Sequence, residues 1–284
     1  MSKIFEVLQQ NGAIGFEGMA LEGIAEPVPA PSTQTAAAPE PQPFPERLVS
    51  LRVSALSPIF PFSEDLHHAA AEQYRIVRTK ILHSEKKPRF VLVSSACPGD
   101  GKTTTAINLA ASLTLKADTS VLLLDADMRK PAIADLLGIP RSPGLADVLS
   151  GRARLEEAVV RTEQFPNFFI LPAGEPTRHA AELLDSDRWR SLAAEIRGRF
   201  SSTIVDAPPV AAVADYDLLQ KTCDGVLLVV RPDHTERTLC IKTLQSIPKD
   251  KVLGVLLNQV REWLFWKAPG YYHYYGKHQS PGSG

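Results

Sequence analysis

A glycine-rich segment between an apolar run and a helix-like run constrains this chain more than any other feature. The run RFVLVSSA (89–96) leads into CPGDGKTTTAINLA (97–110), which matches the pattern G-x-x-x-x-G-K-[ST] except that Ala96 occupies the first glycine position. In such loops the glycines let the backbone approach a phosphate, and the amides that open the following helix point toward it. The segment therefore predicts a phosphate-binding loop between a strand and a helix.

Alternating apolar and helix-like segments continue along the chain. Further strand-like runs lie at 120–127, 168–174, 202–209, 225–232 and 252–260, and helix-like stretches at 64–84, 188–200 and 235–247. Short Val, Ile and Leu runs are typical of strands that are buried on both faces. The expected fold class is therefore α/β, with a doubly wound, mostly parallel sheet of the P-loop NTPase type and a disordered N-terminal linker.

Composition divides the chain into four expected regions: a short amphipathic segment (1–12), a Pro/Ala-rich disordered linker (13–63), a P-loop domain (64–262) and a flexible tyrosine-rich tail (263–284). The first segment places Ile4, Phe5 and Leu8 on one helical face, which indicates either a docking helix or a frayed terminus without a role. The linker holds nine of the 23 prolines. Proline opposes both helix propagation and sheet pairing, so we expect no regular structure there.

The overall composition excludes several classes of protein. The longest apolar runs, such as Val226–Val230, are far shorter than the roughly 18 residues that a membrane span needs. No signal peptide follows Lys3, so we expect a cytoplasmic location. The formal net charge of −1 indicates no nucleic-acid partner. Three scattered cysteines predict neither a disulfide framework nor a zinc site.

Three aspartates end two of the strand-like runs. Asp125 and Asp127 follow VLLL (121–124), and Asp206 follows STIV (202–205) in the form of a Walker B motif. The carboxyl ends of parallel strands meet at the edge where open α/β sheets bind ligands. Asp206 is expected to hold the waters of a Mg²⁺ ion, and Asp125 or Asp127 to be either a base or an outer-shell metal ligand. A helix cap or a solvated turn is the alternative for each cluster.

The chemistry of the loop assigns roles to its residues. Lys102 is expected to reach the β and γ phosphate oxygens, and the Thr103 hydroxyl to bind Mg²⁺. ATP and Mg²⁺ are thus the expected cofactors. The expected catalytic residues are Lys102, Asp125, Asp127 and Asp206, the expected metal-site residues are Thr103, Asp125 and Asp206, and the loop residues expected to bind ATP are Pro98, Gly99, Asp100, Gly101, Lys102, Thr103 and Thr104.

Three motifs together resemble those of a known family. ACPGDGKTTT (96–105), VLLLDADMRKP (121–131) and IVDAPP (204–209), followed by a tyrosine cluster, resemble the Walker A, A′ and B motifs of the bacterial tyrosine kinases (BY-kinases), which regulate capsular and exopolysaccharide synthesis. The resemblance spans about residues 64–276 and implies an ATP-dependent protein-tyrosine kinase. Ala96 and Ala207 replace a glycine and a threonine that are usual in the family. Neither replacement removes a charged catalytic group.

The resemblance also implies partners. EQYRIVR (72–78) is similar to the family's oligomerisation motif, with Glu72, Arg75 and Arg78 on one helical face, although a solvated charged face would look the same. The family implies a ring of subunits and a membrane-bound polysaccharide copolymerase as activator, so that the protein sits at the inner face of the membrane through this partner. Asn258 resembles an asparagine that related ATPases place on the adenine edge, or is a strand-end turn residue.

Four of the six tyrosines, Tyr271, Tyr272, Tyr274 and Tyr275, lie within five positions of the tail and are the expected phosphoacceptors. The Gly, Ser, Gln and Pro residues around them resist core packing. From Glu262 onward the extended chain could reach some 75 Å, at about 3.3 Å per residue, so modification by a neighbouring subunit is feasible. The alternative is an aromatic patch that packs on a partner.

Two other functions fit the phosphate-binding loop. A partitioning-type ATPase switch would carry a signature lysine five residues before Lys102, where this chain has Cys97. A catalytically silent scaffold of the polysaccharide export complex would bind ATP without turnover. The intact set of Lys102 and the three aspartates argues against the scaffold.

Overall fold

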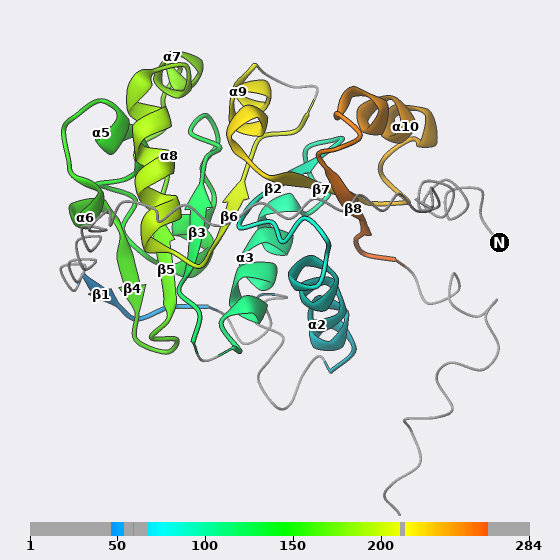
Figure 1. Ribbon diagram of the computed structural model, residues 1–284, viewed down its shortest axis with the longest axis horizontal. Coiled ribbons are helices and arrows are strands. Elements are labelled where there is room, and N and C mark those ends of the chain that lie inside the picture. Colours follow the sequence, from blue (N-terminus) through cyan, green and yellow to red (C-terminus); the bar gives the residue numbers. More distant parts are fainter. Residues whose placement is uncertain (1–46, 54–58, 60–67, 117, 211–213, 261–284) are drawn as a thin grey trace, which may run out of the picture. The chain divides into compact units, whose positions relative to one another are not determined.

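The computed structural model describes residues 47–53, 59, 68–116, 118–210 and 214–260. These residues form one eight-stranded sheet in the order β1-β4-β5-β3-β6-β2-β7-β8 (Figure 1). The strands are β1 (Leu48–Val49), β2 (Phe90–Ser95), β3 (Val121–Asp125), β4 (Val160–Thr162), β5 (Phe168–Leu171), β6 (Ser202–Asp206), β7 (Gly225–Val230) and β8 (Val252–Leu257). All neighbouring pairs are parallel except β4 and β5. The predicted doubly wound, mostly parallel sheet is confirmed.

Helices cover both faces of the sheet (Figure 1). Side chains of α2, α3 and α4 pack on one face, and side chains of α5 to α10 pack on the other. Along β2 the two faces alternate: Phe90 and Leu92 belong to one core, Val91 and Val93 to the other. The helices are α2 (His68–Leu82), α3 (Lys102–Leu113), α4 (Ile133–Leu137), α5 (Leu145–Leu149), α6 (Leu155–Ala158), α7 (Ala180–Leu184), α8 (Asp187–Arg199), α9 (Asp215–Thr222) and α10 (Arg237–Ser246).

Helix α8 shows how local sequence produces these elements. Ser186 caps its start by accepting a hydrogen bond from the Trp189 amide. The buried side chains Trp189, Leu192, Ala193 and Ile196 recur at helical spacing. Burying each of the larger ones contributes roughly 1.5–3 kcal/mol. The Trp189 indole also donates a hydrogen bond of 3.0 Å to the Thr222 hydroxyl, which ties α8 to the end of α9.

The prediction of a structureless linker over 13–63 is wrong for residues 47–53. Strand β1 pairs in parallel with β4, and the Arg52 amide donates to the Leu137 carbonyl. Val49, Leu51 and Val53 pack on the α2–α4 core. These three alternate with residues that point away, which is the period of a half-buried strand. The surrounding prolines obscured this short alternation.

Strand β4 and the short helices α4 to α7 were not predicted. Only a short connection joins β4 to β5, and so short a connection requires an antiparallel pair. The described residues belong to a compact unit, 41–284. Residues 1–12, most of 13–63 and 263–284 lie outside the described residues, so the expectations for them remain predictions. No helix within the described ranges is long and apolar enough to cross a membrane.

Candidate active site

The phosphate-binding loop connects β2 to α3 and adopts a backbone that glycine favours. Gly99 and Gly101 have φ of 89° and 93°, in the left-handed region. A Cβ on Gly101 would lie 1.9 Å from Asn258 Nδ2, so a side chain here would have to displace Asn258 and adopt a strained backbone. Helix α3 begins at Lys102, which places its unpaired first-turn amides, including that of Thr104, at the loop. This is the arrangement that binds a phosphate.

The predicted charged residues meet at the start of α3. Lys102 Nζ lies 3.0 Å from Asp127 Oδ2 and 3.5 Å from Asp206 Oδ1. The Thr103 hydroxyl donates a hydrogen bond of 2.7 Å to Asp206 Oδ2. All these groups are largely buried, with 13% of the Lys102 side chain exposed. The sheet explains the meeting, because β3 and β6 are neighbours and both end at this edge.

Asp125 is placed differently from Asp127. It is the register partner of Asp206 across the β3–β6 pair and is fully buried. Its Oδ1 accepts a hydrogen bond from the Asp127 amide, and its Oδ2 accepts from the amides of Ala132 and Ile133. Asp125 therefore holds the loop that presents Asp127, whereas Asp127 and Asp206 are the carboxylates that contact Lys102.

Burial and mutual repulsion govern the protonation of the site. Burial, reinforced by the charge of Asp206, raises the pKa of Asp125 to about 7 despite its backbone donors and Lys102. Burial likewise raises the pKa of Asp206, against the opposing attraction of Lys102. Burial acts to lower the pKa of Lys102, but Asp206 and Asp127 outweigh it and the net shift is upward. The ammonium thus compensates a cluster of carboxylates that would otherwise repel one another.

The donor set fits a nucleotide-bound Mg²⁺ ion. Within the described part of the chain, no group of three or more His, Cys, Asp or Glu side chains could hold a metal ion by itself. Mg²⁺ does not require such a cage, because it keeps several waters and takes one or two protein oxygens together with phosphate oxygens. Thr103 and Asp206 supply neighbouring hydroxyl and carboxylate oxygens. The oxygens of Asp125 are engaged with backbone amides, and its role as an outer-shell metal ligand remains a prediction.

Asn258 contacts the phosphate-binding loop directly. Its side-chain Nδ2 donates a hydrogen bond of 2.8 Å to the Asp100 carbonyl, and its backbone amide donates to the Val230 carbonyl. The residue follows β8 at the edge where the loop lies. An adenine contact remains a prediction, and the structure adds a contact to the loop backbone that was not anticipated.

Several contacts around the site were missed from the sequence. The Arg129 guanidinium forms two hydrogen bonds to buried Asp215, of 2.7 and 3.0 Å. This pair joins the loop after β3 to the start of α9. Asp100 directs its buried carboxylate to His234 and Thr235, and its expected part in ATP binding remains a prediction. The sequence clue to this contact with Asp100 was that residues 231–235 directly follow the strand β7.

The predicted oligomerisation residues lie on α2. Glu72 and Arg75 form an exposed ion pair of 3.1 Å. Arg78 Nη1 instead donates a hydrogen bond of 2.9 Å to the Ser112 carbonyl near the end of α3. Arg78 thus anchors α2 within the subunit, and Glu72 and Arg75 face solvent. An oligomeric role remains a prediction, and the four predicted phosphoacceptor tyrosines lie outside the described residues.

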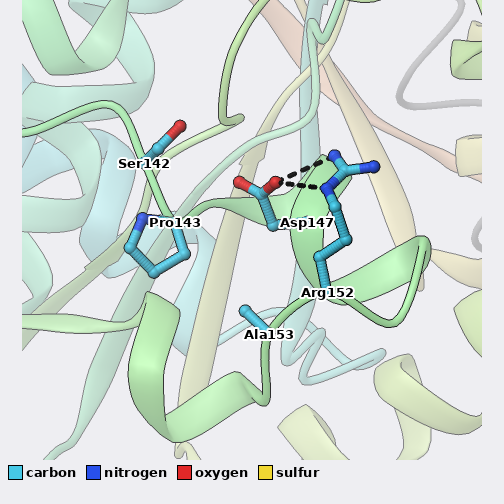
Figure 2. A pocket seen from close by; sticks show the side chains of 5 residues that line it. All are labelled: Ser142, Pro143, Asp147, Arg152 and Ala153. Atoms are coloured by element: carbon cyan, nitrogen blue, oxygen red, sulfur yellow. Dashed lines mark hydrogen bonds and ion pairs between the residues drawn. The ribbon is translucent and has the colours of Figure 1, made fainter.

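A separate hollow of about 250 Å³ contains none of the predicted site residues. It lies around α5, and the carboxylate of Asp147 accepts hydrogen bonds from Arg152 at its wall (Figure 2). Asp147 also accepts from the Gly144 amide, so its carboxylate is engaged in the local fold. The residues that line the hollow are Ser142, Pro143, Asp147, Arg152 and Ala153.

Comparison with known proteins identifies the family. Residues 89–248 match the family model described as AAA domain. Tyrosine-protein kinase YwqD of Bacillus subtilis (strain 168) is 35% identical over 192 residues, which are 66% of this chain and 80% of YwqD. The chain belongs to the bacterial tyrosine kinase family. This is the family associated with capsule and exopolysaccharide synthesis, as the motifs predicted, and its members are tyrosine-protein kinases.

Two solved structures extend the likeness to the fold. The kinase domain of VpsO is 32% identical with a TM-score of 0.61, covering 67% of this chain and 96% of that structure. The chimerical protein CapA2B2 is 25% identical with a TM-score of 0.68, covering 77% of this chain and 96% of that structure. The predicted P-loop fold, nucleotide binding and tyrosine-kinase class are confirmed.

Proposed function

We propose that this protein is an ATP-dependent tyrosine autokinase that phosphorylates its own C-terminal tyrosine cluster in trans and thereby regulates polysaccharide polymerisation and export. The observation that carries the proposal is the meeting of Lys102, Asp127 and Asp206 beside the phosphate-binding loop. A switch or scaffold would not need the tyrosines at 271–275. The chain combines a phosphoryl-transfer site with an acceptor-rich tail.

The site chemistry supports transfer to a phenol. Bound Mg·ATP supplies the transferable phosphoryl group. Lys102 would neutralise charge on the phosphate oxygens, and Thr103 with Asp206 would hold the metal and its waters. A tyrosine hydroxyl has an unperturbed pKa of about 10, so a nearby carboxylate must orient it and accept its proton. Asp127 has the more accessible position for this role, and Asp125 fixes the loop that carries it.

Transfer between subunits is supported by the point at which the described chain ends and by α2. The described chain ends just after β8, at the edge where the phosphate-binding loop lies. The exposed Glu72 and Arg75 give α2 a charged outer face for subunit contacts in a ring. Each added phosphate brings roughly −1.5 to −2 charges, and crowding that charge at an interface favours dissociation. Phosphorylation of the cluster would thus control the assembly state.

The proposed activator is a membrane-bound polysaccharide copolymerase that contributes a cytoplasmic segment and holds the kinase at the inner face of the membrane. The likeness to CapA2B2 supports a kinase that works together with a second protein, because a chimera joins segments of two chains. The amphipathic start (1–12) and the proline-rich stretch after it are the segments of this chain proposed to reach the partner.

The first test maps the modified residues. The purified full chain is incubated with Mg·ATP, with and without the cytoplasmic segment of its copolymerase, and its phosphotyrosines are located by mass spectrometry. Phosphate is expected on the 271–275 peptide and absent from Lys102→Ala. Tyr74 and buried Tyr216 serve as internal controls. Release of free phosphate without phosphotyrosine would favour the ATPase switch, and no turnover under either condition would favour the scaffold.

The second test concerns transfer in trans. Lys102→Ala with intact tyrosines is mixed with an active variant in which all four tail tyrosines are phenylalanine. Phosphotyrosine on the inactive subunit is expected, together with a fall in particle size by light scattering when the wild-type chain is treated with ATP. An unlabelled inactive subunit would rule out transfer between subunits, and a constant particle size would rule out control of assembly.

A further inference from the structure

Asp100 is an acidic residue inside a loop that binds an anion. Its side chain is fully buried and is directed toward the segment that follows β7. Its Oδ1 accepts hydrogen bonds from the Thr235 hydroxyl at 2.5 Å and from His234 Nδ1 at 3.0 Å. Its Oδ2 accepts from the Cys97 amide at 2.9 Å. The carboxylate therefore links the loop to the segment that follows β7.

The backbone of Asp100 is held from a second direction. Its carbonyl oxygen accepts the 2.8 Å hydrogen bond from Asn258 Nδ2, after β8. The loop also has an internal bond from the Ser95 hydroxyl to the Cys97 carbonyl. Side chain and backbone of a single residue thus join three segments that are far apart in the sequence.

These contacts surround the two glycines with positive φ in the loop, Gly99 and Gly101. Asp100 lies between Gly99 and Gly101, and glycine loses more conformational freedom on ordering than any other residue. A loop that must be ordered during binding gives up part of its affinity, whereas a loop that is already ordered does not. The His234 ring also packs beside Gly99, since a Cβ there would lie 3.5 Å from His234 Cε1.

We propose that Thr235 and His234 are positioning residues, which hold the phosphate-binding loop in its nucleotide-binding conformation through the buried carboxylate of Asp100. The ligand affected is the polyphosphate of Mg·ATP. The inference deepens the proposed function, because it concerns the nucleotide site of the same kinase. It extends that site beyond the motif to the stretch RPDHT (231–235), whose His234 and Thr235 amides both donate to the Arg231 carbonyl and form a turn.

Thr235→Val tests the proposal, with Thr243→Val as its matched control. Both threonines are buried, with 6% and 3% exposed. The Thr235 hydroxyl bonds Asp100, whereas the Thr243 hydroxyl on α10 has no hydrogen-bond partner among the described residues. A hydrogen bond to a charged group is a strong one. We expect Thr235→Val to raise the Kd for Mg·ATP about tenfold in titration calorimetry, and Thr243→Val to leave it within twofold.

Hydrogen exchange of the nucleotide-free protein gives a second readout. Amides in the 97–101 peptide are expected to exchange faster in Thr235→Val than in either the wild type or Thr243→Val. Thr235→Ser keeps the hydroxyl and should restore both the affinity and the slow exchange. Unchanged Kd and unchanged exchange in Thr235→Val, at a lower melting temperature, would show a merely structural role and overturn the proposal.

His234→Ala keeps the proposal testable if Thr235→Val does not fold. The His234 side chain is 41% exposed, so its removal should leave the fold intact. We expect a severalfold higher KM for ATP at a nearly constant kcat, and faster exchange at 97–101. Wild-type values in both measurements would exclude His234 from the positioning role. Binding and exchange require no phosphoryl transfer, so their outcome is separate from a failure to detect phosphotyrosine.

Discussion

Replacement of Lys102 by methionine should destabilise the nucleotide-free protein in a pH-dependent manner. The ammonium lies 3.0 Å from Asp127 and 3.5 Å from Asp206, and the site is largely buried. Removing one partner of a buried ion pair costs about 3–5 kcal/mol, since it leaves the other charge without compensation. Lys102→Met should therefore lower the free energy of unfolding by about that amount at pH 8.5.

The pH dependence follows from the acids that remain. Asp125 already has a pKa raised from 3.8 to about 7 in the folded chain. The folded state therefore binds more protons than the unfolded state between about pH 4 and 7, and stability falls as the pH rises through that window. Lys102 lowers the pKa of Asp125 and Asp206. Loss of Lys102 should raise both pKa values further, so the free energy of unfolding should keep falling above pH 7. Each pKa unit by which either acid is raised lowers it by about 1.4 kcal/mol.

Urea unfolding at pH 5.5, 7.0 and 8.5 measures this effect. The difference between the wild type and Lys102→Met should be smallest at pH 5.5 and largest at pH 8.5. Lys130→Met is the matched control, because Lys130 is an exposed lysine of the loop after β3 and should change stability by under about 0.5 kcal/mol. A pH-independent loss in Lys102→Met, or an equal loss in Lys130→Met, would refute the electrostatic account.

Three further outcomes are expected. Thr103→Val should abolish the Mg²⁺-dependent part of ATP binding in calorimetry with and without the metal, and Thr103→Ser should retain it, because only serine keeps the hydroxyl that meets Asp206. Gly101→Ala should lose nucleotide binding by the same assay, since its Cβ would clash with Asn258 and its φ is 93°; normal affinity would contradict the loop geometry. Arg129→Met should lower the free energy of unfolding by about 2–3 kcal/mol by leaving buried Asp215 unpaired, and Arg129→Met with Asp215→Leu should recover much of the loss in urea unfolding.

The features that were predictable from the sequence are those encoded by neighbouring residues. Buried parallel strands are continuous apolar runs, so β2, β3, β5, β6 and β7 could be placed, β3 and β6 together with their terminal aspartates. The run at β8 was also placed, but this edge strand is only partly buried, not buried on both faces as its apolar residues predicted. The phosphate-binding loop was recognisable because its glycines, Lys102 and Thr103 occupy fixed offsets. Strand β1 was missed, since its alternation is short and lies among prolines.

The contacts between loops were not predictable. Asp100 and Thr235 are 135 residues apart in the sequence, and Arg129 and Asp215 are 86 apart. Each pair meets because the sheet order places β2 beside β7 and β3 beside β6. Strand order depends on the packing of the whole domain, and no local pattern in one sequence encodes it. The separate roles of Asp125 and Asp127 were hidden for the same reason, since the amides that engage Asp125 become visible only in the folded loop.

Strands β1 and β8 lie at opposite ends of the strand order. With neighbouring strands about 4.8 Å apart, the two edges are separated by roughly 34 Å. The polypeptide therefore enters this domain on one flank and leaves it on the other. A partner that binds beside β1 would therefore sit at the opposite edge of the sheet from β8, so the two sites would not compete for space.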